Sequence, residues 1–161
     1  GNIEITDLDT VWQRADIISL HCPLTKENHH IINSDAIEKM KDGVFVLNTS
    51  RGGLIDSNAL ISGLKSGKIG GAALDVYEEE SDLFFEDNSG HILEDDILAR
   101  LISMPNVIVT SHQAFLTREA LDNIAETTIN NIVTFFSNGQ CPNELCFRGD
   151  SAEDCKCEKC F

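Results

Sequence analysis

The sequence predicts an α/β fold built on a parallel sheet, and two observations carry that prediction. Short apolar runs alternate with helical segments four times along the chain, and parallel strands need such crossovers, which are usually helical. The runs are apolar throughout rather than alternating, which is typical of strands covered on both faces. With 161 residues, of which 42% are hydrophobic, the chain is long enough to bury a core of its own.

Four buried strands are expected, each rich in aliphatic or small residues and bounded by turn residues. They lie at 16–20, 44–48, 71–75 and 107–110. Four helices are expected between and after them, each beginning at a Ser, Asp or Thr or ending at a Gly or Pro. They lie at 34–40 with Ser34 as N-cap, at 56–65 with Asp56 or Ser57 as N-cap, at 94–103, and at 117–138 with Thr117 as N-cap. The first ten residues show no apolar periodicity and no obvious cap, so no element is expected there.

The charge balance limits the partners. Twelve Lys and Arg against 27 Asp and Glu give a formal net charge of −15, and long-range repulsion then disfavours nucleic acid and anionic membranes. No apolar run approaches the ~18 residues of a transmembrane helix, and no basic-then-apolar signal segment opens the chain. We therefore expect a cytoplasmic protein with neither a nucleic-acid nor a membrane partner.

The cysteines are concentrated at one end of the chain. Of the six, only Cys22 precedes residue 141, so the body of the protein does not depend on disulfides. The segment 155–160 (CKCEKC) has a C-x-C-x-x-C spacing that can bind a soft metal ion, but a single triplet is a moderate signal. We assign no metal ligands, and we expect a disordered tail because residues 141–161 offer little apolar surface to bury.

Polar residues gather just after each expected strand, where ligands bind in open parallel sheets. They are His21, Cys22, Pro23 and Asn28 after the first strand, 49–53 after the second, Asp75 and Glu78–Glu80 after the third, and Ser111–Gln113 after the fourth. An Arg, carboxylates and a His at one rim permit anion recognition and proton transfer. Each residue alone also has a plainer interpretation, as a turn Arg, a surface His or a solvated acidic run.

Four motifs in order carry a resemblance to a known family. They are 21–25 (HCPLT) with Asn28, 49–56 (TSRGGLID), 73–80 (ALDVYEEE) and 111–117 (SHQAFLT). The sequence resembles the D-2-hydroxyacid dehydrogenases, NAD-dependent enzymes that interconvert 2-keto acids and D-2-hydroxy acids. Segments 111–117 and 82–87 (DLFFED) are similar to the D-lactate dehydrogenase branch of that family.

The resemblance implies a role for each matching residue. Arg51 would bind the substrate carboxylate and polarise its keto oxygen, and His112 would donate a proton in reduction and accept one in oxidation. Glu80 would hydrogen-bond His112 and favour the imidazolium. NAD contacts would come from Cys22, Pro23, Asn28, Thr49, Ser50, Arg51 and Asp75.

The resemblance also implies a division of the chain. Residues 1–116 would be the second half of a Rossmann-like nucleotide-binding domain, 117–140 a helix returning to the substrate domain, and 141–161 the cysteine-rich tail. The Gly-x-Gly-x-x-Gly turn that approaches the pyrophosphate would lie upstream of Gly1. We therefore expect little turnover from these 161 residues alone, and a homodimer in the full-length form.

The implied reaction is hydride transfer between NADH and a small 2-keto acid, most closely pyruvate reduced to D-lactate. Two alternatives from other classes stay open. The chain is a non-catalytic dinucleotide-binding or interaction module, or it is a metal-binding protein acting through its cysteine tail. The choice between NAD and NADP is also open.

Overall fold

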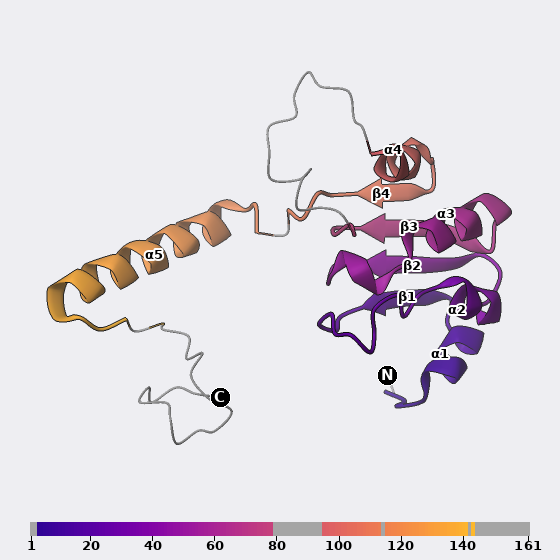
Figure 1. Cartoon of the computed structure of the whole chain (residues 1–161), viewed down its shortest axis with the longest axis horizontal. Helices are drawn as coiled ribbons and strands as arrows, with labels where there is room; N and C mark the ends of the chain where they lie inside the picture. The colour runs from indigo at the N-terminus through magenta and orange to yellow at the C-terminus, as the bar shows by residue number, and fades with distance from the viewer. Residues whose placement is uncertain (1–2, 79–94, 114, 142, 144–161) are drawn as a thin grey trace. The chain divides into compact units, whose positions relative to one another are not determined.

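The computed structural model describes residues 3–78, 95–113, 115–141 and 143. The chain forms two compact units, Gly1–Ala114 and Phe115–Phe161. The elements, shown in Figure 1, are α1 (Leu8–Arg14), β1 (Ile17–Leu20), α2 (Ser34–Lys39), β2 (Val44–Asn48), the 3-10 helix η1 (Gly52–Leu54), α3 (Ser57–Ser66), β3 (Ile69–Leu74), α4 (Asp96–Ser103), β4 (Val107–Val109) and α5 (Arg118–Asn138).

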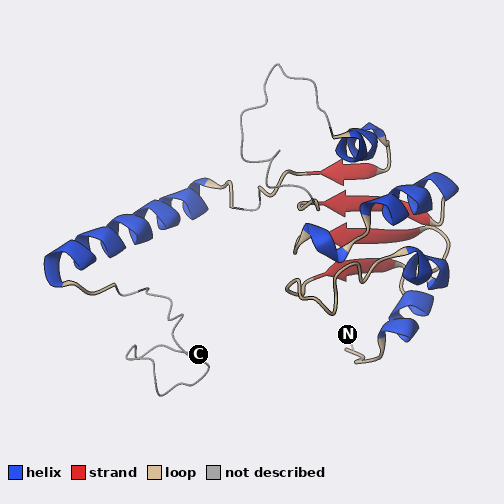
Figure 2. Ribbon diagram, in the orientation of Figure 1, coloured by secondary structure: helices blue, strands red, loops and turns tan. Residues whose placement is uncertain are grey.

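The first unit contains one parallel sheet of four strands in the order β1-β2-β3-β4 (Figure 2). All three strand pairs are parallel, which confirms the predicted fold class. The strands end in register, because Leu20 pairs with Asn48, Asn48 with Leu74, and Leu74 with Val109. The loops that follow them therefore leave the sheet at the same level.

The core lies on one face of this sheet. Val44 and Val46 are 1% and 0% exposed and belong to one cluster with apolar residues of α1, α2, α3 and α4. On the other face Ile17, Phe45 and Ile108 remain 64%, 52% and 65% exposed. The expectation that the strands are covered on both faces is therefore wrong within the described residues of the first unit, since its helices α1–α4 all contribute to the same cluster.

Helix caps follow the sequence closely, with one correction. Asp56 begins α3, where its carboxylate accepts from the amides of Asn58 and Ala59, and Gly67 ends it with a left-handed φ of 77°. The predicted cap Ser34 is instead the first helical residue of α2, because Asn33 accepts from the Ala36 amide at 3.0 Å. Asn33 and Ser34 are both good caps, and only the backbone decides between them.

Two short elements were not expected. Helix α1 begins at the N-cap Asp7 and buries Trp12, but seven residues give too little periodicity to detect. The 3-10 helix η1 follows Arg51. Elsewhere the bounds move by a few residues: β3 begins at Ile69 rather than 71, and α4 begins at Asp96 behind the N-cap Asp95.

Helix α5 of the second unit has the expected ends. The Thr117 side chain accepts from the Ala120 amide at its start, and Gly139 ends it with a φ of 75°. None of its residues is buried, and its apolar side chains Leu121, Ile124, Ile129, Ile132, Val133, Phe135 and Phe136 are all exposed. No helix among the described residues is long and apolar enough to cross a membrane.

Candidate active site

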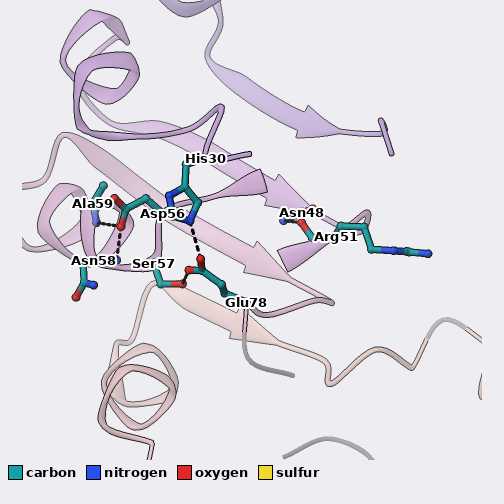
Figure 3. A network of polar contacts seen from close by, with 8 residues as sticks. All are labelled: His30, Asn48, Arg51, Asp56, Ser57, Asn58, Ala59 and Glu78. Atoms are coloured by element: carbon teal, nitrogen blue, oxygen red, sulfur yellow. Dashed lines mark hydrogen bonds and ion pairs between the residues drawn. The ribbon is translucent and has the colours of Figure 1, made fainter. Parts of the chain in front are cut away.

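The turn that carries Arg51 is shaped by a buried amide side chain at the end of β2. Asn48 is 1% exposed; its Nδ2 donates to the Arg51 carbonyl at 2.9 Å and its Oδ1 accepts from the Ser50 amide at 3.0 Å. The Arg51 guanidinium donates to the Ser50 carbonyl at 2.7 Å and is directed away from His30 and Glu78 (Figure 3). Among the described residues no carboxylate forms an ion pair with Arg51, so most of its donors face solvent.

The loop after β1 is tied to this turn. The Ser50 hydroxyl donates to the Cys22 carbonyl at 2.8 Å. Asn28 closes the loop on itself, because its Nδ2 donates to the Pro23 carbonyl at 2.7 Å and its Oδ1 accepts from the Thr25 amide at 2.7 Å. The predicted cofactor residues Cys22, Pro23, Asn28 and Ser50 are thus brought together, with Thr49 exposed beside them.

The turn that carries His112 is held by Asp75, the first residue after β3. The Asp75 carboxylate is buried; its Oδ1 accepts from the Thr110 hydroxyl at 2.5 Å and from the Gln113 amide at 3.0 Å. The Asp75 carbonyl accepts from the His112 amide at 2.5 Å. These bonds enclose Ser111 and His112, whose φ values of 53° and 54° lie in the left-handed region that non-glycine residues rarely adopt.

Two left-handed residues in succession are costly, and they persist only where the surroundings fix them. Here the fixing groups are the carboxylate and the carbonyl of Asp75. The strained pair includes His112, for which the family resemblance predicts the role of proton donor, and such strain is often found at functional sites.

The structure thus gathers the predicted residues after β1, β2, β3 and β4 at one edge of the sheet. Glu80 lies outside the described residues. Asn48 is a further site residue that the sequence motifs do not single out, although a polar residue at the end of an apolar strand is a signal that can mark it. Asp75, expected among the cofactor contacts, uses one carboxylate oxygen to hold the His112 turn.

The hydroxyls and main-chain groups suit the sugar and amide groups of a dinucleotide, and the exposed Arg51 guanidinium suits an anionic group such as a carboxylate or a phosphate. Hydroxyls, main-chain groups and an exposed guanidinium line the carboxyl edge of a parallel sheet, where such ligands bind. The glycine-rich turn for the pyrophosphate is not contained in these 161 residues. These residues are therefore candidates for part of a dinucleotide site.

A half-sheet with these turns at its carboxyl edge defines the class: a Rossmann-like nucleotide-binding domain of the α/β type. The chain belongs to the D-isomer specific 2-hydroxyacid dehydrogenase family, whose NAD binding domain matches residues 1–114. This confirms the family resemblance of the sequence motifs, and NAD as the cofactor of that family.

Three proteins illustrate the similarity. The chain is 53% identical over 143 residues to a D-lactate dehydrogenase of Escherichia coli, covering 89% of this chain and 44% of that protein. It is 54% identical over 142 residues to an aromatic 2-oxoacid reductase of Clostridium sporogenes, covering 88% and 43%. The crystal structure of a D-lactate dehydrogenase from Treponema pallidum superimposes with a TM-score of 0.77 at 41% identity, covering 84% and 41%. The chain thus spans less than half the length of each.

Proposed function

We propose that this chain contributes the catalytic edge of an NAD-dependent oxidoreductase that reduces a small 2-keto acid to the D-2-hydroxy acid. Pyruvate and D-lactate are the proposed pair. One observation carries the proposal: Arg51 and His112 stand on turns that two buried polar residues, Asn48 and Asp75, hold at the same edge of the sheet. Fixed placement of a cation and a proton donor is what such a reduction requires of the protein.

Arg51 is proposed to bind the substrate carboxylate. A guanidinium binds a carboxylate through two parallel hydrogen bonds, which orients the keto group as well as attracting the anion. Its exposed donors, free of any described carboxylate, support this role in a chain with a net charge of −15.

His112 is proposed to give its proton to the keto oxygen while the carbonyl carbon is reduced. The same imidazole would take the proton back when the hydroxy acid is oxidised. Glu80 is proposed to accept a hydrogen bond from His112 and to favour the imidazolium. NADH, when bound, supplies the hydride.

Cys22, Pro23, Asn28, Thr49, Ser50 and Asp75 are proposed to line the cofactor site beside Arg51. Residues 117–140 are proposed as the helix that returns to a substrate domain, and 141–161 as a separate tail. We also propose a cytoplasmic location and a homodimer of the full-length form. One similar protein is named for lactate and another for aromatic 2-oxo acids. These names support the reaction class more directly than they support one particular side chain on the 2-keto acid substrate.

A chimaera tests the proposal. The 143 matched residues replace their counterparts in the Escherichia coli relative, and NADH oxidation is measured with pyruvate and with phenylpyruvate. Saturable turnover is expected. His112→Gln should lower kcat by about 100-fold or more, as for loss of a general acid, and Arg51→Lys should raise KM and lower kcat because the paired contact is lost.

Two results would contradict the proposed catalytic function. A chimaera that binds NADH, followed by its fluorescence, but turns over neither acid would identify a non-catalytic dinucleotide-binding module. Turnover that survives His112→Gln unchanged would remove His112 from the mechanism. The 161 residues alone are expected to show no saturable turnover.

A further inference from the structure

Three potential metal ligands meet where two loops come together, and the Arg51 guanidinium points away from two of them, His30 and Glu78 (Figure 3). His29 and His30 lie in the loop after β1, and Glu78 lies four residues after β3. One ligand atom from each lies within 4.8 Å of the other two. Figure 3 shows His30 and Glu78 facing one another across this junction, with Ser57 beside them.

The backbone places both imidazoles on the same side of the chain. Residues 26–30 form a turn, and His30 has a left-handed φ of 53°. The His29 and His30 rings lie with centroids 3.8 Å apart and their planes tilted by 32°. The turn is fixed from both sides, because the His30 amide donates to the Gly53 carbonyl at 2.9 Å and the Ile31 amide to the Asn28 carbonyl at 3.0 Å.

The carboxylate is also fixed. Glu78 Oε1 lies 2.6 Å from His30 Nε2, and Oε2 accepts from the hydroxyl of Ser57, which is buried. The main chain at Glu78 packs against Gly52, where a Cβ would lie 2.5 Å from the Glu78 nitrogen. The His30 and Glu78 side chains still keep 32% and 30% of their exposure, so an ion can reach them from solvent.

We propose that His29, His30 and Glu78 form a binding site for a divalent transition-metal ion, with Zn²⁺ as the preferred ion. Two imidazole nitrogens and one carboxylate oxygen are a donor set that suits Zn²⁺, and a water molecule completes four-coordination. Mg²⁺ and Ca²⁺ prefer oxygen ligands and are disfavoured here. The Ser57 hydroxyl holds the second carboxylate oxygen, as outer-shell partners of metal ligands do.

The separations between the three ligand atoms must change to admit the ion. Bonds of about 2.1 Å at tetrahedral angles place ligand atoms about 3.4 Å apart. The distance of 2.6 Å between His30 Nε2 and Glu78 Oε1 must therefore lengthen. The widest distance between any two of the three ligand atoms, at most 4.8 Å, must shorten. The bound ion joins the loop after β1 to the segment after β3. This site does not depend on the proposed dehydrogenase function.

The test must exclude the thiols near the C-terminus. We therefore specify the 161-residue chain with Cys141, Cys146, Cys155, Cys157 and Cys160 all replaced by Ser. Zn²⁺ is titrated calorimetrically, and Co²⁺ serves as a spectroscopic probe. One Zn²⁺ per chain is expected, with weak Co²⁺ ligand-field bands and no thiolate charge-transfer band. The melting temperature should rise with Zn²⁺ and not with Mg²⁺, because only an ion that binds the folded chain stabilises it.

Three variants locate the site. His29→Asn, His30→Asn and Glu78→Gln should each weaken Zn²⁺ binding by about tenfold or more, since even outer-shell changes cost that much. Asn is chosen for His30 because it tolerates a left-handed φ. The matched control is His21→Asn, which removes an imidazole that contacts Ser19 and lies outside the cluster, and it should leave the affinity unchanged.

Nuclear magnetic resonance spectra of the imidazoles give a readout that needs no variant. Zn²⁺ should shift the His29 and His30 ring signals and leave those of His21 and His112 in place. Absence of binding in the serine-substituted chain, equal affinity in His29→Asn and the parent, or shifts confined to other histidines would each overturn the proposal.

Discussion

The main-chain N–H of Asp75 donates to the carbonyl of Asn48 at 2.9 Å. This bond joins the ends of β2 and β3, and each of the two residues then uses its side chain to shape a different turn. Asn48 holds the turn that carries Arg51, and Asp75 holds the turn that carries His112. The turns that carry the two proposed catalytic side chains are therefore both anchored to the paired ends of β2 and β3.

Removing the Asp75 carboxylate should loosen the His112 turn. A hydrogen bond to a charged group contributes about 1.5–3 kcal/mol, so Asp75→Ala should speed hydrogen exchange at the Gln113 amide by about tenfold or more. Asp75→Asn is the control, because it keeps one acceptor oxygen at the same place and should preserve most of the protection. Equal exchange in Asp75→Ala and the parent chain would show that Asp75 does not fix the turn.

The two glycines after Arg51 should respond very differently to a methyl group. A Cβ at Gly52 would lie 2.1 Å from the main-chain carbon and oxygen of Tyr77. The three atoms nearest to a Cβ at Gly53 belong instead to side chains, and the nearest is 3.1 Å away on Leu24. Gly52→Ala should therefore lower the free energy of unfolding by about 3 kcal/mol, the upper end for overpacking, and Gly53→Ala by much less. Chemical denaturation measures both, and similar losses would contradict the close approach at Gly52.

The start of α3 should depend on the Asp56 side chain. Its carboxylate accepts from the amides of Asn58 and Ala59, at 2.9 Å and 3.1 Å. Asp56→Ala should destabilise the first unit by about 1 kcal/mol, the usual cost of losing an N-cap. Asp56→Asn should restore most of that loss, because Asn caps helices equally well. Thermal unfolding of the three chains provides the measurement.

Acid should loosen α1 in a way that Asp7 controls. The Thr10 amide, and then the Thr10 hydroxyl, hold the pKa of Asp7 below its usual value of 3.8. A lowered folded-state pKa means that the stabilisation is present above pH 3.8 and is lost as the pH falls through the lower, folded-state value. Fluorescence of Trp12, the only tryptophan, reports the release of α1 from the core. Asp7→Asn keeps a capping oxygen without a titrating charge, so its acid transition should be shallower. An identical transition would exclude Asp7 as the group responsible.

Local residue patterns were sufficient for most of the fold. The strand of 44–48 was predicted with its observed bounds, and Thr117 and Gly139 were placed correctly at the two ends of α5. These signals are local: a β-branched run, a cap and a left-handed glycine act within one or two turns of the chain. Helix α1 was not predicted because its seven residues give too little periodicity. Its buried residue, Trp12, also packs in a core assembled from residues far along the sequence.

The sequence by itself determined the class, the family motifs and the candidates Arg51 and His112, because residue type and spacing carry that information. Only the tertiary structure decided how these candidates are held. The buried Asn48 and Asp75 lie 27 residues apart in the sequence, and they meet because β2 and β3 pair in register. The same is true of His30 and Glu78, which lie in separate loops and come within 2.6 Å of each other. Such contacts depend on which strands pair, and parallel strands are joined by crossovers of a dozen or more residues, so no pattern within one segment specifies them.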